Sequence, residues 1–226
     1  MSQFGEATSP PATPDTPQDH ATQRERRSRR TRYLLSGLLG LMLLVSLLSG
    51  WLSFRIQQGR KQRQDVAVLE QMGAEVLYLN YGTPHWLVSL FGVDAFLDVS
   101  IVLFLPDSPV DDNGLAWLKR FPELHSLNLA DTRITDAGLA YLRELTELRS
   151  LRLDRTQVSD AGLVHITNLS QIEELDLSGT QVTNACLGQF ANLPRLWSLD
   201  VTHTQVTHAG IVERFGPNGP RFVVRY

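Results

Sequence analysis

Few residues in this chain have the type and spacing that catalysis or metal binding requires. His203 and His208 lie five positions apart. The 24-residue repeat described below places one of them in a turn after a strand and the other at a helix start. The single cysteine, Cys186, lies beside neither of them in that register, and one cysteine excludes an intramolecular disulfide or a multi-cysteine metal site. A third ligand or a paired base is missing. The sequence therefore predicts no catalytic residue, metal or cofactor, and Cys186 is interpreted as a buried packing residue.

Phosphate and nucleic-acid chemistry are disfavoured in the same way. The sequence has neither a phosphate-binding glycine loop nor an H-E-x-x-H zinc motif. Residues 100–219 contain 15 acidic and 9 basic residues, whereas phosphate recognition needs an excess of positive charge. We therefore expect a binding or structural protein that does not bind nucleic acid, and not an enzyme.

The composition is ordinary on average but divides the chain into segments of different character. A length of 226 residues suits one or two domains. Of these residues 42% are hydrophobic, and the net charge is -3. Residues 1–32 contain almost no large apolar side chains and several prolines, so we expect a disordered basic tail. Residues 33–54 are continuously apolar, and the pattern after residue 64 indicates a globular part.

The apolar segment runs from Tyr33 to Phe54 without a charge. As a helix it would be about 33 Å long, which matches a hydrocarbon layer about 30 Å thick. A core helix of a soluble protein would have a polar face, and a cleavable signal peptide would have a shorter apolar stretch and a small-residue cleavage site. We predict one transmembrane helix over 33–54 and a juxtamembrane linker over 55–63.

The basic residues around this segment predict its orientation. Six arginines precede it and four basic residues follow it, which favours a cytoplasmic N-terminus and an extracytoplasmic C-terminal part in a single-pass protein of the cell membrane. Small residues four positions apart in the segment favour a weak homodimer through the helix. The small pairs are Ser36 with Gly40 and Ser46 with Gly50, and the basic residues are Arg24, Arg26, Arg27, Arg29, Arg30, Arg32, Arg55, Arg60, Lys61 and Arg63.

From about residue 100 the sequence repeats with a period of 24 residues. Each copy opens with an apolar residue, has a leucine three positions later and another apolar residue two positions after that. The opening residues are Leu124, Leu148, Ile172 and Leu196, and an earlier copy keeps Leu103 and Leu105 but has Ser100 at the opening position. This register predicts five repeats over 100–219.

Each repeat has the pattern of a strand, a turn and a short helix. The last two apolar residues alternate with polar ones, which is typical of a strand with one buried face. A threonine follows whose hydroxyl can bond the turn backbone, and Asp136 and Asp160 suit the positive first turn of a helix. The predicted helix N-caps are Thr135, Ser159, Thr183 and Thr207. Because no unit can bury its own apolar face, the expected fold is an α/β solenoid with a parallel concave sheet and short convex helices.

The string T-x-[VI]-[TS]-D-A-G-L, preceded by L-x-x-L-x-L, resembles leucine-rich repeats of the ribonuclease-inhibitor and cysteine-containing types over about residues 100–211. This resemblance implies a horseshoe segment. The order of basic leader, apolar helix, spacer and repeats also resembles membrane-anchored leucine-rich-repeat proteins of planctomycete-type bacteria. The chain departs from the repeat pattern at Asn184, Cys186 and His208, and it has no F-box-like segment.

The flanks of the repeats are expected to seal the ends of the solenoid. Residues 64–99 are the predicted N-terminal cap, with a helix over 64–71, a strand over 75–81, and Thr83 as an N-cap before Pro84 at the first helical position. Residues 220–226 are the predicted C-terminal cap, in which Phe222, Val223 and Val224 form an edge strand.

Three ladders of side chains should point outward from the predicted sheet. They are Val102, Ser126, Ser150, Glu174 and Ser198; Phe104, Asn128, Arg152, Asp176 and Asp200; and Pro106, Ala130, Asp154, Ser178 and Thr202. Neighbouring strands lie about 4.8 Å apart, so Asp176 and Asp200 become like-charged neighbours, which is mildly destabilising. Either this is a solvated polar face, or it is a docking surface for a basic partner. The candidate partner-binding residues are Asp154, Glu174, Asp176, Asp200, Arg152, Asn128 and Phe104.

Together these patterns predict a membrane-anchored repeat protein that binds a protein or peptide through the concave face. The alternative is a structural or assembly component of the cell envelope without a discrete ligand.

Overall fold

The computed structural model describes residues 17–79, 83–93, 96–216 and 219–226, and of residues 17–34 the backbone alone. Two compact units make up the chain, Met1–Phe54 and Arg55–Tyr226. Helix α1 (Pro17–Gln71) contributes to both units, and each unit is described by itself.

The described part of the first unit is helical. The stretch Leu35–Gln71 of α1 contains a window of mean hydropathy 2.0, none of it buried, and by length and composition this stretch qualifies to cross a membrane. Helix α1 begins at Pro17, whereas the sequence predicts a disordered tail over 1–32; residues 1–16 lie outside the described residues. The difference over 17–32 has a physical reason, because arginine, glutamine and glutamate are good helix formers and extending an existing helix needs no new nucleus.

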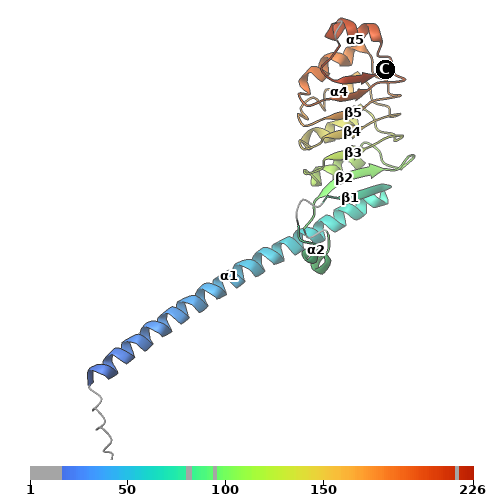
Figure 1. The fold of residues 1–226 in the computed structure, drawn as a ribbon. Coiled ribbons are helices and arrows are strands. Elements are labelled where there is room, and N and C mark those ends of the chain that lie inside the picture. The colour runs from blue at the N-terminus through green and yellow to red at the C-terminus, as the bar shows by residue number, and fades with distance from the viewer. Residues whose placement is uncertain (1–16, 80–82, 94–95, 217–218) are drawn as a thin grey trace, which may run out of the picture. The chain divides into compact units, whose positions relative to one another are not determined.

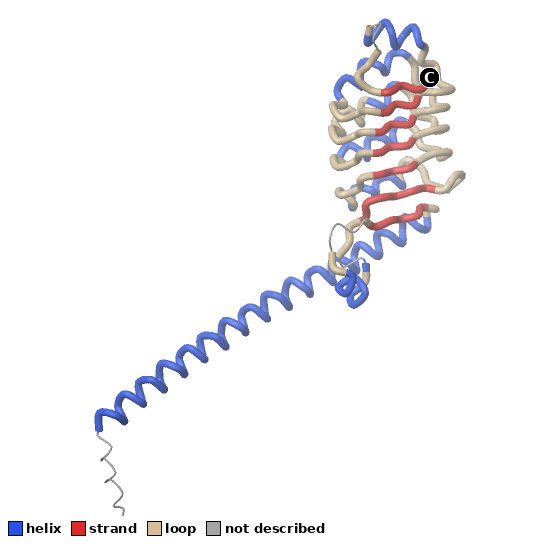
Figure 2. Tube along the Cα trace, viewed as in Figure 1, coloured by secondary structure: helices blue, strands red, loops and turns tan. Residues whose placement is uncertain are grey.

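The second unit is a stack of strands with helices on one side (Figures 1 and 2). Its described residues form a seven-stranded sheet in sequence order, antiparallel between the first two strands and parallel thereafter. The strands are β1 (Ala74–Tyr78), β2 (Val99–Phe104), β3 (Ser126–Asn128), β4 (Ser150–Arg152), β5 (Glu174–Asp176), β6 (Ser198–Asp200) and β7 (Val223–Arg225). The helices are α2 (His85–Phe91), α3 (Asp136–Leu139), α4 (Asp160–Leu163) and α5 (His208–Phe215), and the 3₁₀ helices η2 (Gly114–Arg120), η3 (Ala140–Glu144) and η4 (Asn184–Asn192).

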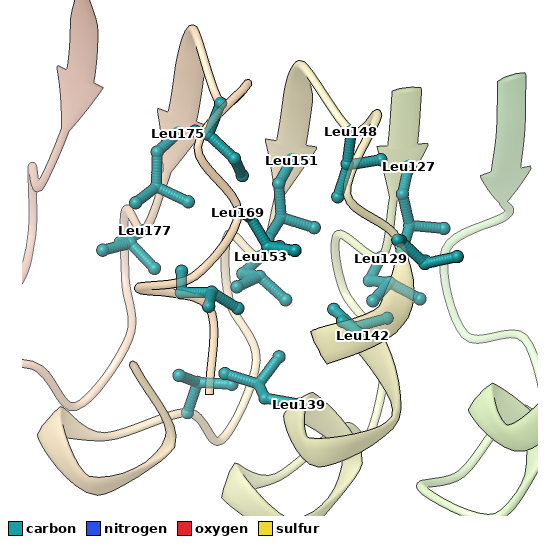
Figure 3. Close-up of a cluster of buried hydrophobic side chains, with 14 of the residues drawn as sticks. Leu127, Leu129, Leu139, Leu142, Leu148, Leu151, Leu153, Leu169, Leu175 and Leu177 are labelled. Atoms are coloured by element: carbon teal, nitrogen blue, oxygen red, sulfur yellow. The ribbon is translucent and has the colours of Figure 1, made fainter. Parts of the chain in front are cut away.

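The core lies between the sheet and the helices and confirms the 24-residue register from the second repeat onward. Leu127, Leu151 and Leu175 pair across β3, β4 and β5, and all three are buried (Figure 3). The opening residues Leu124, Leu148, Ile172 and Leu196 are also buried. An apolar column thus runs through neighbouring repeats, which is why a single repeat is not an independent folding unit.

The first repeat is shifted by one residue from the predicted register. Ile101 pairs with Ser126 and Val102 with Leu127, so Val102 and Phe104 enter the core while Leu105 is 48% exposed. The prediction that Val102 and Phe104 point outward is therefore wrong. Side chains alternate along a strand, so a one-residue shift exchanges its two faces. The run Val99–Phe104 is apolar on both faces, and its periodicity alone cannot choose between them.

The turns and helix starts follow the sequence. The threonine hydroxyls after the strands donate to backbone carbonyls three residues earlier, as Thr132 does to Leu129 at 2.6 Å and Thr156 to Leu153 at 2.7 Å. Each predicted N-cap accepts from a backbone N–H of its own helix. The N-cap residues are Thr135, Ser159, Thr183 and Thr207.

A second set of bonds joins the helix starts of neighbouring repeats. The Asp136 carboxylate accepts from Ser159 N at 2.7 Å and from Ser159 Oγ at 2.6 Å. The same pair of contacts occurs between Asp160 and Thr183, at 2.8 and 2.6 Å. Asp112 with Thr135 and Asn184 with Thr207 extend this series, which we call the capping ladder. The sequence predicts that Asp136 and Asp160 favour their own helix; in the structure each also caps its neighbour.

The capping ladder explains the small residue in each repeat. A Cβ atom on Gly162 would lie 2.4 Å from Asp136 Oδ1, so the surroundings must shift to admit even a small side chain there. The fourth repeat has Cys186 at this position, where the thiol is buried beside Asp160. Burial, with a smaller contribution from the nearby Asp160 carboxylate, raises the pKa of Cys186 to about 12. The prediction of a buried packing cysteine is confirmed.

Both ends of the repeats are covered by packed elements. Val66 and Leu69 of α1 enter the core, and Asp65 pairs with Arg120 at 2.7 Å. Helix α2 has Pro84 as its N-cap and begins at His85, one residue later than predicted. The predicted C-terminal edge strand forms as β7.

Candidate functional site on the sheet face

The solvent-facing side of strands β3 to β7, which we call the sheet face, is the surface that the sequence predicts to be concave. Each of the strands β3 to β6 presents two polar or charged side chains there, on either side of a buried leucine. The outward residues are Ser126, Asn128, Ser150, Arg152, Glu174, Asp176, Ser198 and Asp200. The last strand adds Val223 and Arg225.

Asp176 and Asp200 are direct neighbours, as predicted. Each also caps its own turn. Asp176 Oδ1 accepts from Ser178 N at 3.0 Å and Ser178 Oγ at 2.8 Å. Asp200 Oδ1 accepts from Thr202 N and Oγ1 at the same two distances. One oxygen of each carboxylate therefore has a structural role, and the other faces outward.

Two arginines reduce the repulsion between these carboxylates. Arg152 Nε lies 3.6 Å from Asp176 Oδ2, and Arg225 Nη1 lies 3.8 Å from Asp200 Oδ2. The sequence suggests Arg152 alone as the compensating charge. Arg225 was missed because β7 follows a break in the 24-residue period, so its pairing with β6 is not visible as a repeat.

Asp154 is buried, with 2% of the residue exposed, so the prediction that it lies on the open face is wrong. Its carboxylate lies between Arg152 Nη2 at 3.1 Å and Arg155 Nη2 at 3.2 Å. The Arg152 contact is an ion pair without hydrogen-bond geometry. Arg155 also bonds Asp131, which lowers the pKa of that carboxyl. These groups form a charge network at the turns in which Asp154 is buried and the two arginines remain exposed.

A shallow hollow of about 250 Å³ lies on the C-terminal half of the sheet face. Its charged lining residues are Arg152, Glu174, Asp176, Asp200 and Arg225, and its aromatic lining residue is Trp197. Trp197 is 52% exposed. Glu174 is exposed too, and the one hydrogen bond that its side chain makes among the described residues is a long contact of 3.4 Å with Ser150 Oγ.

Trp197 is, besides Arg225, a lining residue that the sequence reasoning does not predict. It follows the opening residue of its repeat, at the position that His125, Arg149 and Glu173 occupy in earlier copies. The predicted outward ladders begin one position later, so they do not include this column. A large aromatic in a column of charged and polar residues is the signal that would have identified it.

The structure brings together four of the seven predicted partner-binding residues. Arg152, Glu174, Asp176 and Asp200 line the hollow. Asn128 is outside this lining, and its side chain accepts from Ala130 N at 2.9 Å, as a turn cap. The other two, Asp154 and Phe104, are buried.

The histidines do not form a site with the cysteine. His208 Nδ1 lies 2.7 Å from the Tyr226 hydroxyl, and the two rings stack. His203 lies in a turn with φ of 57°. Among the residues that the structure describes, no three His, Cys, Asp or Glu side chains are arranged to hold a metal ion.

Comparisons with known proteins identify the repeats. Leucine-rich repeat models match residues 146–206 and 123–142. Among solved structures, an internalin C2 from Listeria monocytogenes str. 4b F2365 is 26% identical, with a TM-score of 0.39, over 48% of this chain and 44% of that one. Another internalin from the same strain is 20% identical, with a TM-score of 0.36, over 49% and 36%. This chain thus spans less than half the length of either structure. No curated protein matches significantly. Residues 123–142 and 146–206 thus have the sequence pattern of leucine-rich repeats.

Proposed function

We propose that this chain is a membrane-anchored leucine-rich-repeat protein that binds a protein or peptide through the sheet face. The observation that carries the proposal is the half-exposed Trp197 at the edge of the charged hollow. Tryptophan is enriched among the residues that dominate binding energy, because it buries a large area and loses little side-chain freedom. A solvated face has no comparable need for it.

The charges of the hollow favour a partner segment with a basic side chain. Arg152 and Arg225 already face carboxylates of the same surface, whereas Glu174 has no ion pair among the described residues. A lysine or arginine of the partner would satisfy Glu174, and the Trp197 ring can hold the same cation over its face. The hollow therefore fits a basic peptide segment better than an acidic one.

The anchor in this proposal is the apolar stretch of α1. Side chains over 35–54 are largely exposed to solvent in the first unit, which is unfavourable in water and favourable in lipid. The excess of arginines before the stretch favours an extracytoplasmic repeat unit in the cell membrane. The small-residue pairs of the stretch support a weak homodimer. The repeat sequence supports the ribonuclease-inhibitor-like and cysteine-containing subtype.

A structural component of the envelope is the second candidate. Strand β7 is the last strand of the described sheet and pairs there with β6 alone, so a further strand from another chain has a place to pair. In that case the chain would associate with copies of itself and would need no discrete ligand.

Pull-down of the full chain from solubilised membranes separates these functions. A stoichiometric partner should be recovered with the wild type and with Val164→Ala, which alters an exposed side chain on the helix side. Recovery should fall at least tenfold with Trp197→Ala. Self-association alone, unaffected by Trp197→Ala, would favour the structural role and refute the binding proposal.

A further inference from the structure

Helix α2 exposes an apolar surface that the repeats do not use. The segment HWLVSLF has no carboxylate, lysine or arginine, and none of its residues is buried. Trp86 is 63% and Leu90 is 67% exposed, and Val93 just after the helix is exposed too. Trp86 and Leu90 are spaced at i and i+4 within the helix, so they share one face, whereas Val93 follows the end of the helix at Gly92. A helix in water normally turns such a face toward a core.

The opposite side of α2 is held in place by packing. Phe91 and Phe96 have ring centroids 5.9 Å apart, and Phe96 and Leu97 are buried. Backbone bonds from Gly92 N to Val88 O and from Leu97 N to Val93 O, both 2.8 Å, close the turn after the helix. The exposed face is therefore presented by an ordered segment.

The residues after α2, of which Phe96 packs against Phe91 of the helix, contact α1 at the start of the second unit. The Arg55 guanidinium lies 5.8 Å from the Phe96 ring centroid, and Gln62 Nε2 donates to Leu97 O at 3.0 Å. Arg55 is the first residue after the uncharged stretch 33–54. If that stretch crosses the membrane, Arg55 lies at the level of the lipid headgroups, and a segment that packs against it lies at the same level.

We infer that α2 rests in the membrane interface and inserts Trp86 and Leu90 among the lipids. The inference rests on the proposed membrane anchor. Tryptophan favours this layer because its ring is apolar and its N–H can still reach water. The neighbouring basic residues Arg60 and Lys61 are exposed and suit anionic headgroups. The repeat unit thus has a second, non-covalent contact with the membrane.

Spin labels on the full chain in phosphatidylcholine vesicles with a minor share of phosphatidylglycerol test this inference. Cys186 is buried with a raised pKa, so single introduced cysteines can be labelled selectively, with the wild type as the blank. Leu90→Cys probes α2, and Leu44→Cys probes the apolar stretch. Val164→Cys, at an exposed position just after α4, is the aqueous control. The ratio of collisions with oxygen to collisions with a water-soluble nickel chelate reports depth.

The label at Leu90→Cys should give a ratio several times that at Val164→Cys and below that at Leu44→Cys. A ratio at Leu90→Cys equal to the aqueous control, with Leu44→Cys in lipid, refutes the inference and leaves the anchor intact. An aqueous ratio at Leu44→Cys refutes both. A label at Leu90→Cys shielded from oxygen and nickel alike shows a protein contact and also overturns the inference.

Fluorescence supplies a measurement without a label. Brominated lipids should quench the tryptophan emission of the wild type more than that of Trp86→Phe, because Trp86 contributes a lipid-exposed ring. Equal fractional quenching in the two proteins would contradict insertion of α2.

Discussion

At the scale of single residues, the capping ladder connects each helix start to the next repeat. Asp136 stabilises Ser159, which is itself the N-cap of α4, so one carboxylate supports both the junction and the following helix. A hydrogen bond to a charged group typically stabilises a folded protein by about 1.5–3 kcal/mol. The conserved spacing within the chain, 23 residues from acceptor to N-cap, makes this a property of the repeat and not of one site.

Removing one acceptor from the ladder should destabilise the repeat unit. Asp136→Ala leaves Ser159 N without its 2.7 Å acceptor, and we expect the free energy of unfolding to fall by about 1–3 kcal/mol. Denaturant titration of the full chain in detergent micelles measures this. Glu213→Ala, at an exposed position of α5, should change it by less than about 0.5 kcal/mol. Equal stability of the two variants would show that the ladder contributes nothing.

The Cys186 thiol should be unreactive in the folded chain. Its folded-state pKa of about 12 exceeds the usual value near 9. The contribution of the protonated thiol to the free energy of unfolding is therefore complete below pH 9 and declines as pH rises toward 12. At pH 8 a thiol reagent should not react until denaturant is added, when one thiol per chain should appear. Cys186→Ala should lose less stability than the wild type between pH 9 and 11. Rapid labelling of the native chain would contradict the burial.

At the scale of elements, the strands depend on leucine columns that pass from repeat to repeat. Leu151 lies between Leu127 and Leu175 (Figure 3). Leu151→Ala should therefore lower the free energy of unfolding by about 2–5 kcal/mol, through lost burial and a cavity. Val164→Ala, at an exposed position, should have an effect below about 0.5 kcal/mol in the same titration. An unchanged transition for Leu151→Ala would mean that the repeat register is wrong.

The neighbouring carboxylates of Asp176 on β5 and Asp200 on β6 allow a test of their role in capping the turns after these strands. Asp176→Asn with Asp200→Asn keeps an oxygen that can accept from Ser178 and Thr202, so stability should change by less than about 1 kcal/mol, since lost ion pairs offset the lost repulsion. Alanine at both positions removes the turn bonds and should cost about 1–3 kcal/mol. Partner binding by the asparagine variant should weaken and depend less on salt. If both double variants are equally stable, the turn-capping role is wrong.

The elements also show what the sequence can and cannot predict. The strands β3 to β6, the N-caps and the threonine turns follow from period and residue type, because each choice is local. The register of β2 does not follow, because both of its faces are apolar. The burial of Asp154 does not follow either, because residue type alone does not show that Arg152 and Arg155 lie against its carboxylate. The pairing of Arg225 with Asp200 joins residues on two sides of a break in the repeat. Four lining residues of the hollow could be predicted, and Trp197 lay one position outside the ladders that were considered.

At the scale of the whole molecule, the proposed binding protein joins an apolar anchor to a repeat unit whose sheet face holds Trp197. Crosslinking in native membranes tests the binding claim most directly, with a photoreactive phenylalanine analogue at position 197 or, as the control, at position 164. If a partner binds through the sheet face, we expect an adduct between this chain and a different protein from position 197 and none from position 164. Equal adducts from both positions, or adducts of the chain with itself alone, would contradict binding of a partner through the sheet face.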